Sequence, residues 1–99
     1  KIVNNKDATN FLSFPACLMA TGCRGTLVQM VKEKMVDVVI TTVGTVSHDI
    51  IRLKDDYYEG KFEMDDKWLH EEEIFRLGNV LIKEESFGPF EERMLSFFR

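Results

Sequence analysis

Apolar positions along the first half of the chain predict a strand, a helix and a second strand. An apolar run over residues 10–16 indicates the first strand, which Pro15 should end because proline donates no hydrogen bond to a sheet. Residues 24–35 carry apolar side chains at the spacing of one helical face. The run "VDVVITTV", residues 36–43, is nearly all β-branched and is typical of a parallel strand covered on both faces. This order is that of one βαβ unit.

The second half of the chain has a less regular pattern. A turn over residues 44–46 should lead into a helix over residues 47–59, with Ser47 or Thr45 as its N-cap and Gly60 as its end. The remaining expected elements are a short helix, a third strand and a final helix entered near Pro89, over residues 68–73, 79–82 and 90–98. The whole order predicts an α/β fold with a mostly parallel sheet.

The length of 99 residues allows one small domain. Residues 1–9 are polar and should form a loose entry segment. The chain starts with lysine rather than methionine and ends on Phe97, Phe98 and Arg99 without a cap. We therefore expect residues 1–99 to be a single partial domain, cut from a longer protein.

Charge and cysteine content exclude several classes of function. The net charge is −4 without a basic cluster, so a nucleic-acid partner is not expected. No apolar stretch reaches the roughly 20 residues of a membrane span, and no signal peptide is visible. Cys17 and Cys23 lie close together without zinc-ligand spacing, so we expect no metal site and a reducing, cytoplasmic setting. Both cysteines are interpreted as small buried residues.

Two strand-to-helix connections should lie at the carboxyl ends of the strands, where open α/β sheets bind ligands. The first, residues 16–22, places small side chains before a helix N-terminus, which suits a phosphate. The alternative is that Gly22 only permits a tight turn.

The second connection has the sequence "TTVGTVSHD". Thr41 and Thr42 offer hydroxyls to a ligand or to the local backbone, and Gly44 allows close approach. His48 is expected in the first turn of a helix, where the helix dipole would lower its pKa and keep it neutral. The alternative is that His48 is a partly exposed capping residue.

Four separated segments carry a resemblance to a known family. They are "FLSFPACLMATGCRGTLVQMV", "MVDVVITTVGTVSHDII", "DDYYEGKF" and "EIFRLGNVLI", the last with an R-x-G-N before a strand. In this order and spacing, residues 10–95 resemble the deoxyhypusine synthase family, and are closer to archaeal-type or deoxyhypusine-synthase-like members than to the animal enzyme.

The resemblance implies a truncated Rossmann-like NAD-binding domain without the usual glycine fingerprint. It implies a transferase in which NAD takes a hydride from spermidine and 1,3-diaminopropane is released. The aminobutyl group then passes, through an enzyme lysine, to a lysine of the hypusine-containing translation initiation factor. The resemblance also implies a homotetramer, so a homo-oligomer is expected.

The resemblance also assigns site residues. Two NAD-contacting loops of the family correspond to Ala16, Cys17, Leu18, Met19 and Ala20, and to Thr42, Val43 and Gly44. The polyamine-binding positions correspond to Ser47 and His48, where the animal family pattern has two acids. Because a neutral His forms no ion pair with a cationic amine, a related transfer such as homospermidine formation is an alternative.

The family's catalytic lysine and most of its polyamine-binding acids lie in a C-terminal half that these residues do not match. No lysine of this chain takes that role, and the chain alone is expected to be inactive. A non-catalytic α/β binding or oligomerisation module is the alternative from another class. A conventional Rossmann dehydrogenase is disfavoured, because the glycine fingerprint and a ribose-binding acid after the second strand are missing.

Overall fold

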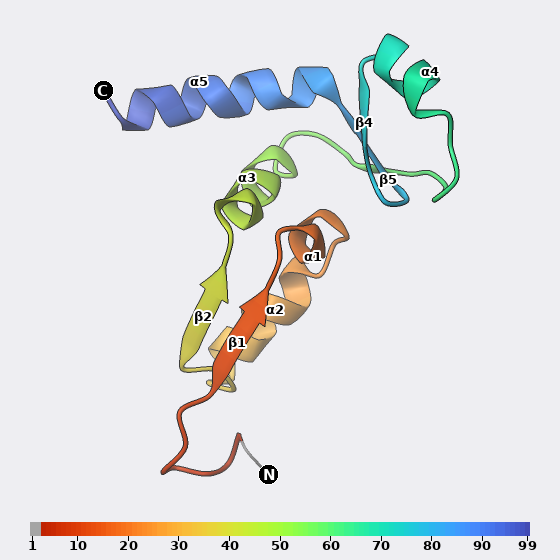
Figure 1. The fold of residues 1–99 in the computed structure, drawn as a ribbon. Coiled ribbons are helices and arrows are strands. Elements are labelled where there is room, and N and C mark those ends of the chain that lie inside the picture. Colours follow the sequence, from red (N-terminus) through yellow and green to blue (C-terminus); the bar gives the residue numbers. More distant parts are fainter. Residues whose placement is uncertain (1–2) are drawn as a thin grey trace. The chain divides into compact units, whose positions relative to one another are not determined.

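The computed structural model describes residues 3–99, which form two compact units. The first unit ends at Val46, and the second runs from Ser47 to Arg99. In chain order the elements are β1 (Phe11–Phe14), α1 (Cys17–Ala20), α2 (Arg24–Lys32), β2 (Val38–Thr41), α3 (Val43–Ile51), β3 (Tyr58–Glu59), α4 (Asp66–Glu71), β4 (Ile74–Leu77), β5 (Val80–Lys83), the 3₁₀ turn η1 (Glu84–Phe87) and α5 (Gly88–Phe97) (Figure 1).

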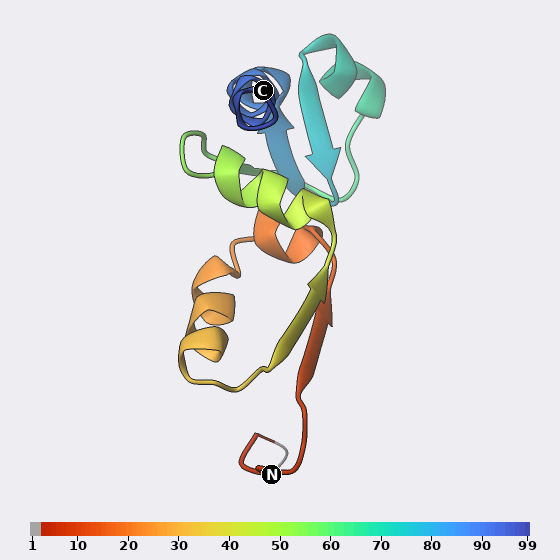
Figure 2. The ribbon, with the colours of Figure 1, turned by 90° about the vertical axis from the view of Figure 1, so that its left-hand side faces the viewer.

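The first unit is built on a pair of parallel strands. β1 and β2 pair over their whole length, with Phe14 opposite Thr41 at their carboxyl ends. At the other end, the Asn10 amide donates to the Asp37 carboxylate at 2.7 Å, and the Asp37 amide donates to the Asn10 carbonyl at 2.9 Å. α1 and α2 lie in the connection, with α2 beside the strand pair (Figure 2). The predicted strand, helix and parallel strand are confirmed.

The second unit contains an antiparallel sheet of three strands in the order β3-β5-β4. β4 and β5 form a hairpin through Gly78 and Asn79, and Gly78 takes a φ of +64° that suits glycine. The Asp65 carboxylate caps α4 by accepting from the Lys67 and Trp68 amides at 3.0 and 3.2 Å. Ser86 and Pro89 lead into α5, as the sequence predicts.

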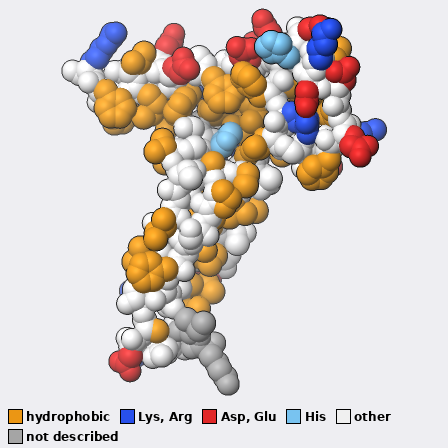
Figure 3. Space-filling view, viewed as in Figure 1, with side chains coloured by type: hydrophobic (Ala, Val, Ile, Leu, Met, Phe, Trp, Pro, Cys, Tyr) orange, Lys and Arg blue, Asp and Glu red, His pale blue; other side chains and the backbone are white. Residues whose placement is uncertain are grey.

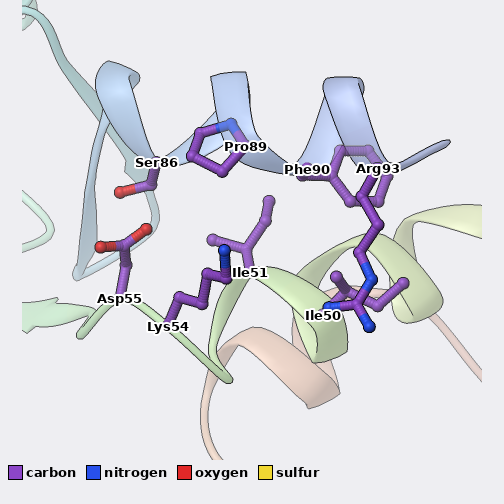
Figure 4. A pocket seen from close by; sticks show the side chains of 8 residues that line it. All are labelled: Ile50, Ile51, Lys54, Asp55, Ser86, Pro89, Phe90 and Arg93. Atoms are coloured by element: carbon purple, nitrogen blue, oxygen red, sulfur yellow. The ribbon is translucent and has the colours of Figure 1, made fainter. Parts of the chain in front are cut away.

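α3 and α5 pack closely at the C-terminal end of α3. Ile51, which is 2% exposed, lies between the two helices, and Ser86 is 4% exposed beside them (Figure 4). The space left between their side chains is only ≈ 10 Å³, about the room of one water molecule. This contact is therefore packing within the second unit. The buried apolar residues of the described chain are Met19, Ala20, Ile51, Leu69 and Ile82.

The expectation of a mostly parallel sheet is wrong beyond β1 and β2. The strand expected over residues 79–82 is present as β5, but it pairs antiparallel with β3 and β4. The sequence pattern also missed β4, which is joined to β5 by two residues. So short a connection permits only antiparallel pairing. The fold is a mixed α/β arrangement with a small parallel sheet. The predicted α/β class is thus present, but the sheet is not mostly parallel.

The helix expected over residues 47–59 begins earlier and ends earlier. α3 starts at Val43, so Gly44 lies in its first turn instead of in a turn before it, and neither Thr45 nor Ser47 is the N-cap. α3 ends at Ile51, and Tyr58–Glu59 form β3 instead of helix. The consecutive acids Asp55 and Asp56 separate the two elements, and Asp has a low helix propensity.

The other boundaries differ by a few residues. The first strand ends at Phe14, directly before Pro15, and the first long helix ends at Lys32 because Lys34 takes a left-handed φ of +53°. α1 is an additional short helix inside the first predicted connection. Within the expected entry segment, residues 1–2 lie outside the described residues, and residues 3–9 contain neither helix nor strand.

Candidate functional site

Two strand-to-helix connections meet at the carboxyl ends of the parallel pair. β1 leads through Pro15 and Ala16 into α1, and β2 leads through Thr42 into α3. The Thr41 hydroxyl joins them: it donates to the Phe14 carbonyl at 2.7 Å and lies 2.6 Å from the Thr45 hydroxyl. The predicted arrangement of the two connections at one sheet edge is therefore present.

Ala16 and Gly44 are the closest point between these connections. A Cβ atom built on Gly44 would lie 2.9 Å from the Ala16 Cβ, closer than carbon atoms normally approach. The backbone of α3 therefore reaches the first connection only because residue 44 has no side chain. A side chain at Gly44 would push the two connections apart.

The five residues assigned to the first loop divide by exposure. Cys17 is exposed, which corrects the expectation that it is buried, and Ala16, Leu18 and Cys23 are half-buried. Met19 and Ala20 are 8% and 2% exposed, and belong to the core. A ligand at this loop would meet the side chains of residues 16–18, and could meet only the backbone of the next two.

The second loop is shorter than the sequence predicts. Thr42 is exposed between β2 and α3, and Val43 is the first residue of α3 with 82% of its surface exposed. Gly22 takes a φ of +95°, which explains glycine at the turn after α1 as backbone geometry. The tight-turn interpretation of Gly22 is thus sufficient.

His48 and Ser47 belong to the second unit. Both are half-buried on α3. His48 Nδ1 lies 2.7 Å from the Tyr57 hydroxyl, and the two rings meet edge to face. Arg52 lies over the Tyr57 ring, with its guanidinium carbon 5.3 Å from the ring centroid. The cluster of His48, Tyr57 and Arg52 is called the histidine cluster below.

The expected direction of the His48 pKa is confirmed, but the expected cause is wrong. His48 lies in the last turn of α3, where a helix dipole favours a charged imidazole instead of a neutral one. Its pKa is lowered mainly by burial, and secondly by the positive charge of Arg52. His48 is therefore neutral for a reason that the sequence did not reveal.

Sequence reasoning missed two members of the histidine cluster. Arg52 could have been found, because it follows His48 by four residues and so shares its helical face. Tyr57 lies nine residues after His48, in a connection that was expected to be helical. No pattern in the sequence predicts that Tyr57 contacts His48.

Other features carry little chemistry. An apolar groove of ≈ 400 Å³ lies in the first unit between α2 and the strand pair. Within residues 3–99, no group of three or more His, Cys, Asp or Glu side chains is placed to hold a metal. None of the helices in that range is long and apolar enough to cross a membrane.

Comparison with known proteins places these features in context. The family model "Deoxyhypusine synthase" matches residues 1–99. A "Probable deoxyhypusine synthase" of Picrophilus torridus is 50% identical over 92 residues, covering 92% of this chain and 30% of the relative. Proteins with the same name from Thermoplasma volcanium and Ignicoccus hospitalis are 50% and 54% identical over 91% and 86% of this chain, and 29% and 27% of their own lengths. The chain thus spans less than a third of the relatives it matches.

Proposed function

The chain belongs to the deoxyhypusine synthase family, and we propose that it is part of a longer NAD-dependent transferase, called the parent enzyme below. The parent enzyme would transfer the aminobutyl group of spermidine to a lysine of the hypusine-containing translation initiation factor. The observation that carries this proposal is identity of about half of all positions over most of the chain, to relatives named for that activity.

NAD is proposed to bind at the two strand-to-helix connections, as part of a Rossmann-like domain. The residues present fit such a group: the contact between Ala16 and Gly44 holds the two connections together, Thr42 is exposed between them, and α3 is long enough to have a useful dipole at its N-terminus. When bound, NAD would accept a hydride from the amine substrate. The chain's own contribution would be to hold the dinucleotide through backbone N–H groups and small side chains.

Ser47 and His48 are proposed to bind the polyamine. α3 carries Gly44 at its start and His48 in its last turn, so one helix contributes residues to both tasks. His48 presents a neutral imidazole, which donates or accepts a hydrogen bond without forming an ion pair. This observation also favours a second candidate, a homospermidine-forming polyamine transferase.

The direct test incubates the purified parent enzyme with NAD and spermidine and measures 1,3-diaminopropane. Its release, with transfer to the purified initiation-factor precursor, is the expected result. Release with transfer to a free amine instead would favour the homospermidine reaction. NAD binding without release would indicate a non-catalytic module and would contradict the proposed activity.

The 99-residue chain alone should release no 1,3-diaminopropane in the same assay, because the catalytic lysine is proposed to lie in other parts of the parent enzyme. Cytoplasmic location and assembly into a homotetramer belong to the same proposal. Sedimentation velocity of the parent enzyme tests the assembly.

A further inference from the structure

The hydrogen bond between His48 and Tyr57 restricts which nitrogen of the imidazole can meet a ligand. Nδ1 and the Tyr57 hydroxyl are 2.7 Å apart, and the ring centroids are 5.7 Å apart at an interplanar angle of 88°. This edge-to-face arrangement fixes the ring as well as its nitrogen. A ligand that hydrogen-bonds to this imidazole would therefore have to meet Nε2.

The surroundings of the pair keep both groups uncharged at neutral pH. Burial is the main cause that raises the pKa of the Tyr57 hydroxyl, so the phenol keeps its proton at neutral pH. His48 is neutral for the same reason. His48 Nδ1 lies within hydrogen-bond distance of that hydroxyl, and the distance fits either tautomer of a neutral imidazole. Because a phenol is a stronger donor than acceptor and a neutral imidazole nitrogen accepts well, the arrangement favours a hydroxyl that donates to Nδ1 and an imidazole proton on Nε2.

Two charged side chains act on this pair. Arg52 lowers the pKa of both rings and opposes an imidazolium, whereas Asp55 raises the pKa of Tyr57. Arg52 also lies over the Tyr57 ring, in a cation–π contact that holds the ring in place. The arrangement therefore favours a neutral His48 that donates from Nε2.

We propose that Tyr57 is a positioning residue of the amine site, which orients His48 so that its Nε2–H donates to the uncharged nitrogen of the substrate amine. This inference rests on the proposed function. A carboxylate binds the ammonium form of an amine, whereas a neutral imidazole N–H binds the lone pair of the free amine. The carbon beside an amine nitrogen can lose a hydride only when that nitrogen is uncharged. Selection of the free amine therefore suits the proposed reaction.

The test compares Tyr57→Phe with the unchanged parent enzyme, since phenylalanine keeps the ring and removes only the hydroxyl. The KM for spermidine should rise roughly 3- to 10-fold, the effect of one lost hydrogen bond, while the KM for NAD stays unchanged. Without a donor to Nδ1, the neutral imidazole is less favoured. The acid limb of kcat/KM should therefore move to higher pH. A shift to lower pH would mean that Nδ1 donates to Tyr57, and would overturn the proposal.

Tyr58→Phe is the matched control. Tyr58 lies next in the chain, on β3, and is 50% exposed. In the described residues, no hydrogen bond joins its hydroxyl to His48. Its loss should change neither the KM for spermidine nor the pH profile. Equal effects of the two substitutions would indicate a general disturbance of β3 and would contradict a positioning role.

A second measurement does not depend on activity. Diethylpyrocarbonate modifies neutral imidazoles, so the pH midpoint of His48 modification, read by peptide mass spectrometry, reports its protonation. His70, which is exposed on α4, is the internal reference for reagent reactivity. In Tyr57→Phe the His48 midpoint should move to higher pH, and an unchanged midpoint would overturn the inference. If the unchanged enzyme releases no 1,3-diaminopropane while this midpoint moves, the proposed function has failed and the role of Tyr57 in orienting His48 has not.

Discussion

At the scale of single residues, Gly44 is a position where a single methyl group should have a large effect. Gly44→Ala would place a Cβ 2.9 Å from the Cβ of Ala16, and neither atom can move without its backbone. We expect a loss of about 1–3 kcal/mol in the free energy of unfolding, as for other overpacked sites, together with weaker NAD binding by the parent enzyme. Chemical denaturation and a fluorescence titration with NAD measure the two effects.

Gly25 provides the control for this substitution. It lies in α2, and a Cβ there would meet nothing within 4 Å. Gly25→Ala should be neutral or stabilising by up to about 1 kcal/mol, because alanine favours helix over glycine, and it should leave NAD binding unchanged. Equal NAD affinity in the Gly44 and Gly25 variants would show that the close approach at Gly44 does not shape the proposed cofactor site.

His48 should make stability depend on pH. Its pKa is lowered from the ordinary 6.5, mainly by burial, so the unfolded chain binds the proton more readily than the folded chain. The free energy of unfolding should therefore fall as the pH drops through 6.5 toward the lowered folded-state pKa. His48→Gln should lose this part of the fall. Thermal midpoints measured between about pH 7.5 and 5 test this, and His70→Gln, a substitution of the same kind at an exposed position, is measured beside it as the control.

At the scale of elements, Arg76 joins α4 to the β4–β5 hairpin. Its guanidinium donates to both oxygens of Asp66 at 2.7 and 2.9 Å, and to the carbonyls of Phe62 and Gly78 at 2.9 and 3.1 Å. The Arg76 side chain is only 23% exposed. The arginine and glycine of the R-x-G-N motif are thus accounted for by structure: Arg76 binds the carbonyl of Gly78, where the hairpin turns.

Replacement of Arg76 should show that geometry matters here more than charge. A lysine ammonium cannot reproduce the planar fork that binds Asp66 and two carbonyls together. Arg76→Lys should therefore lower the thermal midpoint nearly as far as Arg76→Ala. Lys67→Ala, which removes an exposed ion pair to Glu71 at 4.0 Å, should leave the midpoint unchanged. If lysine restored most of the stability lost with alanine, simple charge pairing would be the better account.

The sequence predicted helices and strands best where their position depends on neighbouring residues in the chain. The β-branched run before Thr42 correctly predicted β2, and Pro15 correctly predicted the end of β1. Both predictions depend on local effects. The start of α3 at Val43 could not be predicted, since Gly44 is typical of a turn and disfavours a helix, yet it lies in the first turn of α3. β3 is only two residues long and depends on pairing with β5, which no local pattern reveals.

The candidate site was predictable to a similar degree. The sequence predicted that the two connections would meet at one sheet edge, and the contact between Ala16 and Gly44 confirms this. It did not predict that Met19 and Ala20 are buried, because exposure within so short a helix as α1 depends on tertiary packing. The pairing of Tyr57 with His48 depends on where α3 ends, and that end was placed wrongly.

At the scale of the whole molecule, neither face of the parallel strand pair is fully covered. Val39 and Ile40 are successive residues of β2, so their side chains point to opposite faces, yet they are 45% and 55% exposed. Phe11 on β1 is 65% exposed, and hydrophobic side chains lie at the surface over both strands (Figure 3). Parallel strands are normally covered on both faces. In the parent enzyme, other segments or subunits are expected to cover these strands.

Ile40→Lys should therefore have opposite effects in two settings. In the 99-residue chain alone, a lysine at a half-exposed position should reduce self-association and binding of a hydrophobic dye, because it interrupts an exposed apolar surface. In the parent enzyme the same lysine would be an unpaired charge in a covered position, and should cost at least about 3 kcal/mol of stability. Sedimentation velocity of the chain and thermal denaturation of the parent enzyme give the comparison. Equal tolerance in both would mean that this face of β2 stays exposed to water in the assembled enzyme.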